Sequence, residues 1–183
     1  TGLSRIRPAK EQYDWSPIDR IFELCAKYNK KINLAIPAGR WSPEWIYAEG
    51  AEKFSWRMKE DYVDPGEANW TAPVPWDPIY LKILKETAEK AGERYKDSPL
   101  LVSVQVTGPS LANGLEANLN ISKKHAESIK YSPEKFINAW EYMFDAYSAA
   151  FPKQRLSWCI HDMMPEGRNP VPGRTIRDWA VAK

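Results

Sequence analysis

One acidic residue follows the most regular apolar stretch of the chain. Residues 100–106 alternate β-branched with aliphatic side chains and predict a buried strand, which the Thr-Gly-Pro segment 107–109 ends. The polar loop behind this strand carries Glu116, shortly after Asn113. In an α/β fold, a carboxylate just past the carboxyl end of a strand stands where general acid–base chemistry is usually found. A solvated loop acid is the plainer alternative.

Three further polar residues are expected at strand ends. His161 and Asp162 follow a predicted strand at 156–160, so their side chains can reach a pocket at the same edge of the sheet. The alternative is a polar pair held by the backbone. Arg7 closes an apolar segment at 3–8 that we interpret as a strand, and it can bind a hydroxyl or carboxylate or pair with a loop acid.

The tryptophans are concentrated in one region. Five of the nine lie between residues 37 and 76, where hydrophobic periodicity is lost: Trp41, Trp45, Trp56, Trp70 and Trp76. Long loops in compact domains are often functional. An indole can stack on the apolar face of a pyranose ring, or it can simply pack the loop onto the domain. We expect at least one of Trp41, Trp45, Trp70 and Trp76 to line a pocket.

Helices and strands alternate along the chain. The pairs Ser16–Pro17, Asp77–Pro78 and Ser132–Pro133 each predict a helix start, and strands are expected at 32–36, 100–106 and 156–160. Apolar residues at helical spacing from 18 to 28 predict that one side of the first of these helices faces the core. Residues 163–173 are expected to be loop, with one more helix opening at 175. This order implies parallel pairing through right-handed crossovers. The strand-to-helix loops are the long ones. We therefore predict one α/β domain over 1–183, of the (β/α) TIM-barrel type with helices outside and function at the carboxyl ends of the strands.

Other classes fit less well. An open nucleotide-binding sheet needs closely spaced glycines, but Gly108 and Gly114 stand six apart with a proline between them. His125 and His161 are the only histidines, and Cys25 and Cys159 lack metal-ligand spacing, so no metal or cofactor is predicted. Both cysteines are expected to be buried, reduced thiols.

Charge and hydropathy restrict the partners. With 26 basic and 24 acidic residues the net charge is +2, and no basic stripe favours nucleic acid. No apolar run approaches the roughly 20 residues of a membrane span.

Short pieces of the sequence resemble a known family. The segments YDWSPID at 13–19, INLAIPAG at 32–39 and SPEWI at 42–46 are similar to the amino-terminal half of retaining glycoside hydrolases with (β/α)8 barrels, above all microbial β-galactosidases. The helix and strand from 77 to 106 resemble the elements that lead to the acid/base residue in those enzymes. The resemblance implies a carbohydrate ligand, with Glu116 as the acid/base. For such a ligand, the candidate sugar contacts are Arg7, Trp41, Trp45, Trp76, Asn113, His161 and Asp162.

Two departures from the family pattern keep alternatives open. Those enzymes carry Asn-Glu at the strand end, where this chain has 107–109, and they have eight strands where we place four or five. A partial barrel is therefore expected, in which the strand that carries the nucleophile is missing. Glu166 is only a weak candidate to replace that nucleophile. Its exposed apolar sheet face would favour a homo-oligomer that completes the barrel. A non-catalytic carbohydrate-binding or interaction protein, or a barrel enzyme acting on a non-sugar, are the rival interpretations.

Overall fold

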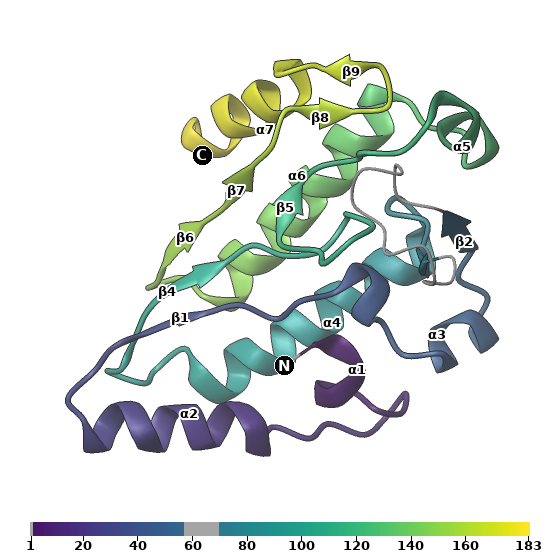
Figure 1. Cartoon of the computed structure of the whole chain (residues 1–183). Helices are drawn as coiled ribbons and strands as arrows, with labels where there is room; N and C mark the ends of the chain where they lie inside the picture. The colour runs from purple at the N-terminus through teal and green to yellow at the C-terminus, as the bar shows by residue number, and fades with distance from the viewer. Residues whose placement is uncertain (1, 57–69) are drawn as a thin grey trace.

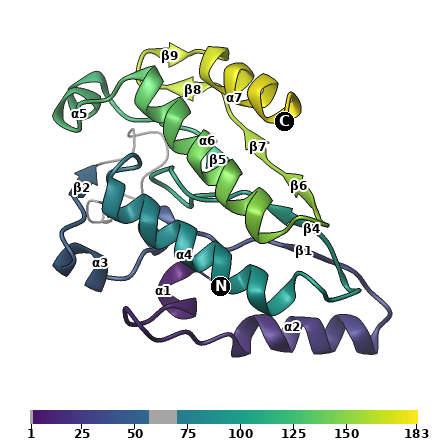
Figure 2. The ribbon, with the colours of Figure 1, turned by 180° about the vertical axis from the view of Figure 1, so that it is seen from behind.

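A parallel sheet of three strands lies at the centre of the computed structural model. Strands β1 (Ile32–Leu34), β4 (Leu101–Gln105) and β6 (Arg155–Ser157) pair in the order β1-β4-β6, and both pairs are parallel. The long helices α4 (Pro78–Tyr95) and α6 (Pro133–Ala150) lie together behind the sheet in Figure 1 and in front of it in the reverse view of Figure 2. The strands predicted at 32–36, 100–106 and 156–160, their parallel pairing and the outer helices are confirmed.

The structure describes residues 2–56 and 70–183. Its other helices are α1 (Leu3–Ile6), α2 (Ser16–Lys27), the 3₁₀ turn η1 (Gly39–Trp41), α3 (Trp45–Ala48), α5 (Lys123–Ser128) and α7 (Val171–Val181). Its short strands are β2 (Lys53–Trp56), β3 (Trp70–Pro73), β5 (Glu116–Ala117), β7 (Cys159–Ile160), β8 (Met163–Met164) and β9 (Gly167–Arg168). Within these ranges, no helix has the length and apolar character needed to cross a bilayer.

The two faces of the sheet differ in polarity. Val104 and Leu156 pair with each other and face the helices, and Trp158 packs its indole 5.3 Å from the rings of both Trp140 and Phe144 on α6. The alternate positions form the opposite face, called here the open face: Asn33, Ser103, Gln105, Arg155 and Ser157. These side chains are all polar, so the expectation of an exposed apolar sheet face is wrong.

A register irregularity sets this pattern in β4. Ile32 pairs with Leu101 and Asn33 pairs with Ser103, so Val102 is skipped and is 47% exposed. The extra residue shifts the alternation by one position. Leu101 and Val104 are both buried as a result, although they are an odd number of residues apart.

The three predicted helix starts are confirmed, but only two have the expected cap. The carboxylate of Asp77 accepts from the N–H of Tyr80 at 2.8 Å, and the hydroxyl of Ser132 accepts from the N–H of Lys135 at 3.2 Å. At α2 the hydroxyl of Ser16 makes no cap. Its backbone N–H donates instead to the carboxylate of Asp14 at 3.0 Å.

Two local predictions are wrong. Residues 3–8 were expected to be a strand, but Leu3–Ile6 is the short helix α1, whose Leu3 N–H donates to the Pro37 carbonyl at 2.8 Å. Residues 163–173 were expected to be loop, but β8 and β9 form a hairpin there and α7 begins before the predicted residue 175.

Helix α2 packs less of its apolar stripe than predicted. Ile18 is buried, whereas Ile21 and Tyr28 are 47% and 61% exposed. A polar contact fixes the helix to α4: the guanidinium of Arg94 donates to both carboxylate oxygens of Asp19 at 3.0 and 2.6 Å, and the Tyr95 hydroxyl adds a bond at 2.8 Å.

This contact makes the stability of the fold depend on pH. The hydrogen bonds from Arg94 lower the pKa of Asp19 below its usual value. A carboxylate whose pKa is lowered by folding stabilises the protein fully above its unfolded pKa of about 3.9, and this contribution is lost as pH falls through the folded pKa. Asp19→Asn should therefore lower the unfolding free energy near pH 6 and matter less at pH 3. Urea unfolding at both pH values measures this, and an equal loss at both would contradict it.

Candidate active site

The chain leaves the sheet after β4 in a buried loop. Thr107, Ser110 and Leu111 are only 2–3% exposed. The loop is fixed to the segment that follows β1, because Ala38 N–H donates to the Asn113 carbonyl and Arg40 N–H donates to the Leu111 carbonyl, each at 2.9 Å. The predicted strand end at 107–109 thus belongs to the core and does not line an open mouth.

Two glycines permit this close packing. Gly39 has φ of +61°, and a Cβ there would stand 2.5 Å from the Leu111 carbonyl oxygen. Gly114 has φ of +67°, and a Cβ there would stand 2.9 Å from the Ala38 nitrogen. Any larger residue would be strained in the left-handed region and would also push the two loops apart.

Thr107 occupies a structural position. Its hydroxyl donates to the Ile36 carbonyl at 2.9 Å and lies 2.7 Å from the Tyr147 hydroxyl of α6. Burial raises the pKa of Tyr147 above its usual value, which keeps this phenol neutral. The place where the resembling enzymes carry Asn-Glu therefore holds a neutral hydroxyl pair that joins the sheet to a helix.

Glu116 returns to the sheet after the loop. It forms β5 with Ala117 and pairs in parallel with β7, where Glu116 stands opposite Cys159. β7 follows β6 after one residue. β5 is therefore the parallel neighbour of β7, as β4 is the parallel neighbour of β6. Glu116 is half-buried, and it lies at the carboxyl end of the parallel sheet.

The alternation along β6 and β7 assigns Glu116 to the open face. Trp158 faces α6, and Ile160 faces α7, because a Cβ on Gly173 would meet the Ile160 side chain at 2.6 Å. Cys159 lies between them and points the other way, and its pairing partner Glu116 shares that side. His161, which is exposed, is the next alternate position after Cys159. Gln105, Glu116 and Cys159 thus form one polar group at the carboxyl end of the open face, and His161 follows β7 directly.

Sequence reasoning missed two members of this group. Cys159 was expected to be a buried thiol, but it is exposed. The segment 100–106 was interpreted as buried on both sides, whereas Ser103 and Gln105 are half-exposed. The signal was present: Ser103, Gln105, Ser157 and Cys159 are the small or polar residues at alternate positions of two strands.

Asp162 and Asn113 shape the backbone around the group. The Asp162 carbonyl accepts from the Asn169 N–H at 2.8 Å, and its carboxylate lies 3.6 Å from Arg168, so it stabilises the β8–β9 hairpin. The side-chain oxygen of Asn113 accepts from the Leu115 N–H at 2.9 Å and turns the loop immediately before Glu116.

Arg7 and Trp45 contact each other. The Trp45 indole N–H donates to the Arg7 carbonyl at 3.0 Å, and the Arg7 guanidinium stands 5.0 Å from the rings of both Trp45 and Tyr13. Arg7 is only 3% exposed, and its guanidinium pairs with the carboxylate of Glu86 on α4 at 2.9 Å. Arg7 therefore follows a helix and not a strand, and its partner is a helix acid.

The other tryptophans divide into exposed and packed ones. Trp41, in the turn after β1, is 46% exposed with the Arg40 guanidinium 5.0 Å from its ring. Trp56 is 3% exposed and meets Trp70 edge to face at 5.8 Å. Trp41 is thus the exposed indole that follows a sheet strand at its carboxyl end.

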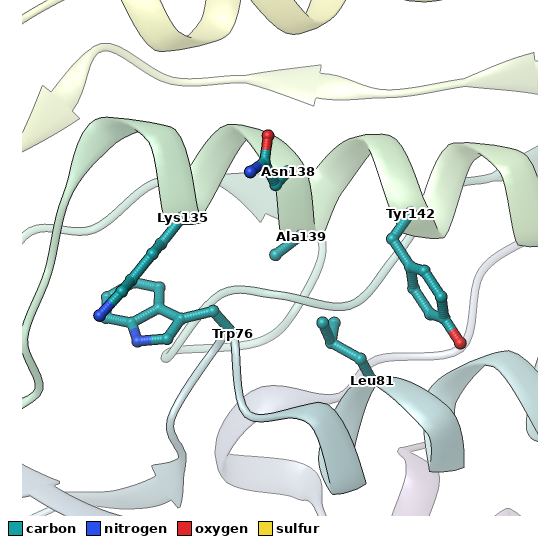
Figure 3. Close-up of a pocket in the computed structure, with 6 residues that line it drawn as sticks. All are labelled: Trp76, Leu81, Lys135, Asn138, Ala139 and Tyr142. Carbon is teal, nitrogen blue, oxygen red and sulfur yellow. The ribbon is translucent and has the colours of Figure 1, made fainter.

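Trp76 lines a separate groove on the outer surface. The groove lies between α4 and α6 and has a volume of about 320 Å³. Figure 3 shows the Trp76 and Lys135 side chains at one end and Tyr142 at the other, with Leu81 and Ala139 between them. Its sixth lining residue is Asn138. This groove is formed by the helices, so Trp76 is not brought to the group around Glu116.

No metal cluster is found in the described part of the chain. Within residues 2–56 and 70–183, no group of three or more His, Cys, Asp or Glu side chains is arranged to hold an ion.

Comparison with known proteins gives a consistent family assignment. The model of glycoside hydrolase family 42, beta-galactosidase, matches residues 2–118. The chain is similar to the beta-galactosidase LacZ of Heyndrickxia coagulans, with 24% identity over 177 residues, which is 92% of this chain and 25% of that protein. It therefore spans a quarter of the length of this curated relative.

Two solved structures have a similar fold. The crystal structure of beta-galactosidase from Bacillus circulans sp. alkalophilus matches with a TM-score of 0.53 and 14% identity, over 84% of this chain and 30% of that one. Endo-glycoceramidase II from Rhodococcus sp., as a lactosyl-enzyme intermediate, matches with a TM-score of 0.51 and 13% identity, over 99% and 50%. The fold is thus of the TIM-barrel glycosidase type, and the described residues form part of such a barrel.

Proposed function

The chain belongs to the beta-galactosidase family of glycoside hydrolases, family 42, and on this basis we propose that it contributes the general acid, Glu116, to a glycosidase site. The observation that carries the proposal is the return of the chain through β5, which aligns Glu116 with Cys159 at the carboxyl end of the sheet. Active sites of barrel enzymes are built at that end.

The proposed reaction proceeds by retention. Glu116 donates its proton to the glycosidic oxygen as the bond from that oxygen to the anomeric carbon breaks, and a second carboxylate attacks the anomeric carbon. Water then hydrolyses the glycosyl-enzyme, and Glu116 accepts a proton from this water as it attacks the anomeric carbon. His161 is proposed to bind a sugar hydroxyl beside Glu116.

The second carboxylate must lie about 5–5.5 Å from Glu116. Glu166 is a weak candidate, because it is exposed and its carboxylate accepts from the Asn169 amide at 2.6 Å in the β8–β9 region. This chain spans a quarter of the length of the LacZ relative. We propose that the nucleophile comes from further strands of the family barrel. Assays should therefore use the complete reading frame that contains these residues.

The test is hydrolysis of a panel of β-glycosides, including β-galactosides, followed by proton NMR. We expect release of the sugar as its β-anomer, before mutarotation produces the α-anomer. Initial release of the α-anomer would contradict retention. Failure of the folded protein to cleave every glycoside in the panel would contradict hydrolysis.

The second candidate is a non-catalytic carbohydrate-binding protein, and the outer groove favours it. The rings of Trp76 and Tyr142 stand at its two ends, over a floor that includes Ala139 (Figure 3). A pyranose ring matches such a groove, because its apolar face can stack on an indole while its hydroxyls meet solvent. Sugar binding without turnover, lost in Trp76→Ala and kept in Tyr28→Ala, just beyond the carboxyl end of α2, would favour this candidate.

A further inference from the structure

We propose that Gln105 is a positioning residue that holds Glu116 in place for proton transfer, an inference that rests on the proposed function. Gln105 is the last residue of β4, and its side-chain amide donates to the Leu115 carbonyl at 2.9 Å. Leu115 immediately precedes Glu116. One hydrogen bond therefore joins the end of β4 to the start of β5 across the whole intervening loop.

The Leu115 backbone is held by side chains on both sides. Its N–H donates to the Asn113 side chain at 2.9 Å, and its carbonyl accepts from Gln105. The next support is β5 itself, which pairs over only two residues. So short a pairing is weak by itself, since strands gain stability from several consecutive hydrogen bonds. The direction of the Glu116 side chain thus depends on Gln105.

The chemistry of this hydrogen bond suggests two substitutions. Gln105→Leu replaces the amide with an apolar group of similar bulk and removes the donor, so the Leu115 carbonyl loses its partner. Gln105→Glu keeps the shape but places a carboxylate oxygen against the carbonyl. A protonated carboxyl group can donate again. The Glu variant should therefore recover activity relative to wild type as pH falls toward about 4.3, the ordinary pKa of glutamate.

Kinetics in the complete protein test the positioning role. Because small displacements of a catalytic group are costly, Gln105→Leu should lower kcat on an unactivated glycoside by about 10- to 100-fold, with KM unchanged. Gln154→Leu is the matched control. The Gln154 amide also donates to a backbone carbonyl, that of Lys96 at 2.7 Å, but at the opposite end of the sheet. We expect this control to leave kcat unchanged.

Hydrogen exchange separates this inference from the proposed function. Amides of residues 115–118 should exchange about fivefold faster in Gln105→Leu than in wild type, as expected for the loss of one hydrogen bond, with the rest of the sheet unaffected. An unchanged exchange rate at residues 115–118 would overturn the positioning role. So would a fully active Gln105→Leu variant together with a Gln105→Glu variant whose activity does not recover at low pH. Faster exchange combined with a fully active Glu116→Gln variant would overturn the proposed function and leave the structural link intact.

Discussion

Glu116→Gln should slow hydrolysis of an unactivated glycoside by about 10²- to 10⁴-fold, the usual contribution of general acid catalysis. Glutamine keeps the size of the side chain and can still form hydrogen bonds, but it has no proton to donate to the leaving oxygen. An aryl glycoside with a good leaving group needs less protonation, so its first step should lose much less. The difference between the two substrates is the signature of a general acid.

Steady-state kinetics on both substrates, with circular dichroism to confirm folding, measure this effect. Glu127→Gln is the matched control, because it makes the same change on an exposed position of α5. We expect the control to behave as wild type. Small and equal losses on both substrates in Glu116→Gln would identify Glu116 as an ordinary loop acid.

Trp140→Ala should produce the largest loss of stability, about 3–5 kcal/mol of unfolding free energy. Trp140 is fully buried on α6, with its ring 6.4 Å from that of Phe136 and 5.3 Å from that of Trp158. Removal of the indole leaves a cavity beneath the strand that carries Cys159. The effect should therefore reach the open face through Trp158.

Guanidinium unfolding followed by circular dichroism measures the loss. Trp41→Ala removes the same side chain from a position that is 46% exposed, so its loss should be much smaller. Comparable losses in the two variants would contradict the assignment of Trp140 to the core between α6 and the sheet.

The regular elements could be predicted from sequence because their signals are local. Pro follows Asp77 and Ser132 at the first helical position, and both residues cap as expected. Strand alternation with helices then fixes parallel pairing. The burial of Ile18 on α2 could also be predicted from periodicity. The exposure of Ile21 and Tyr28 could not, because it depends on which neighbouring elements cover them.

The candidate site could be predicted only in part. Glu116 was singled out because it follows a strand, but its return to the sheet depends on a two-residue pairing with Cys159, a contact 43 positions away for which the sequence has no local signal. The burial of the loop before it depends on Gly39 and Gly114, which tolerate positive φ and close approach. Such long-range packing is decided by tertiary contacts.

A crystal structure of the complete protein with a bound galactoside analogue tests the central claim most directly. The account predicts that the analogue lies on the open face at the carboxyl end of the sheet, with the Glu116 carboxyl group about 2.6–3.2 Å from the atom that replaces the glycosidic oxygen. An analogue bound in the groove between Trp76 and Tyr142, with no sugar beside Glu116, would contradict it.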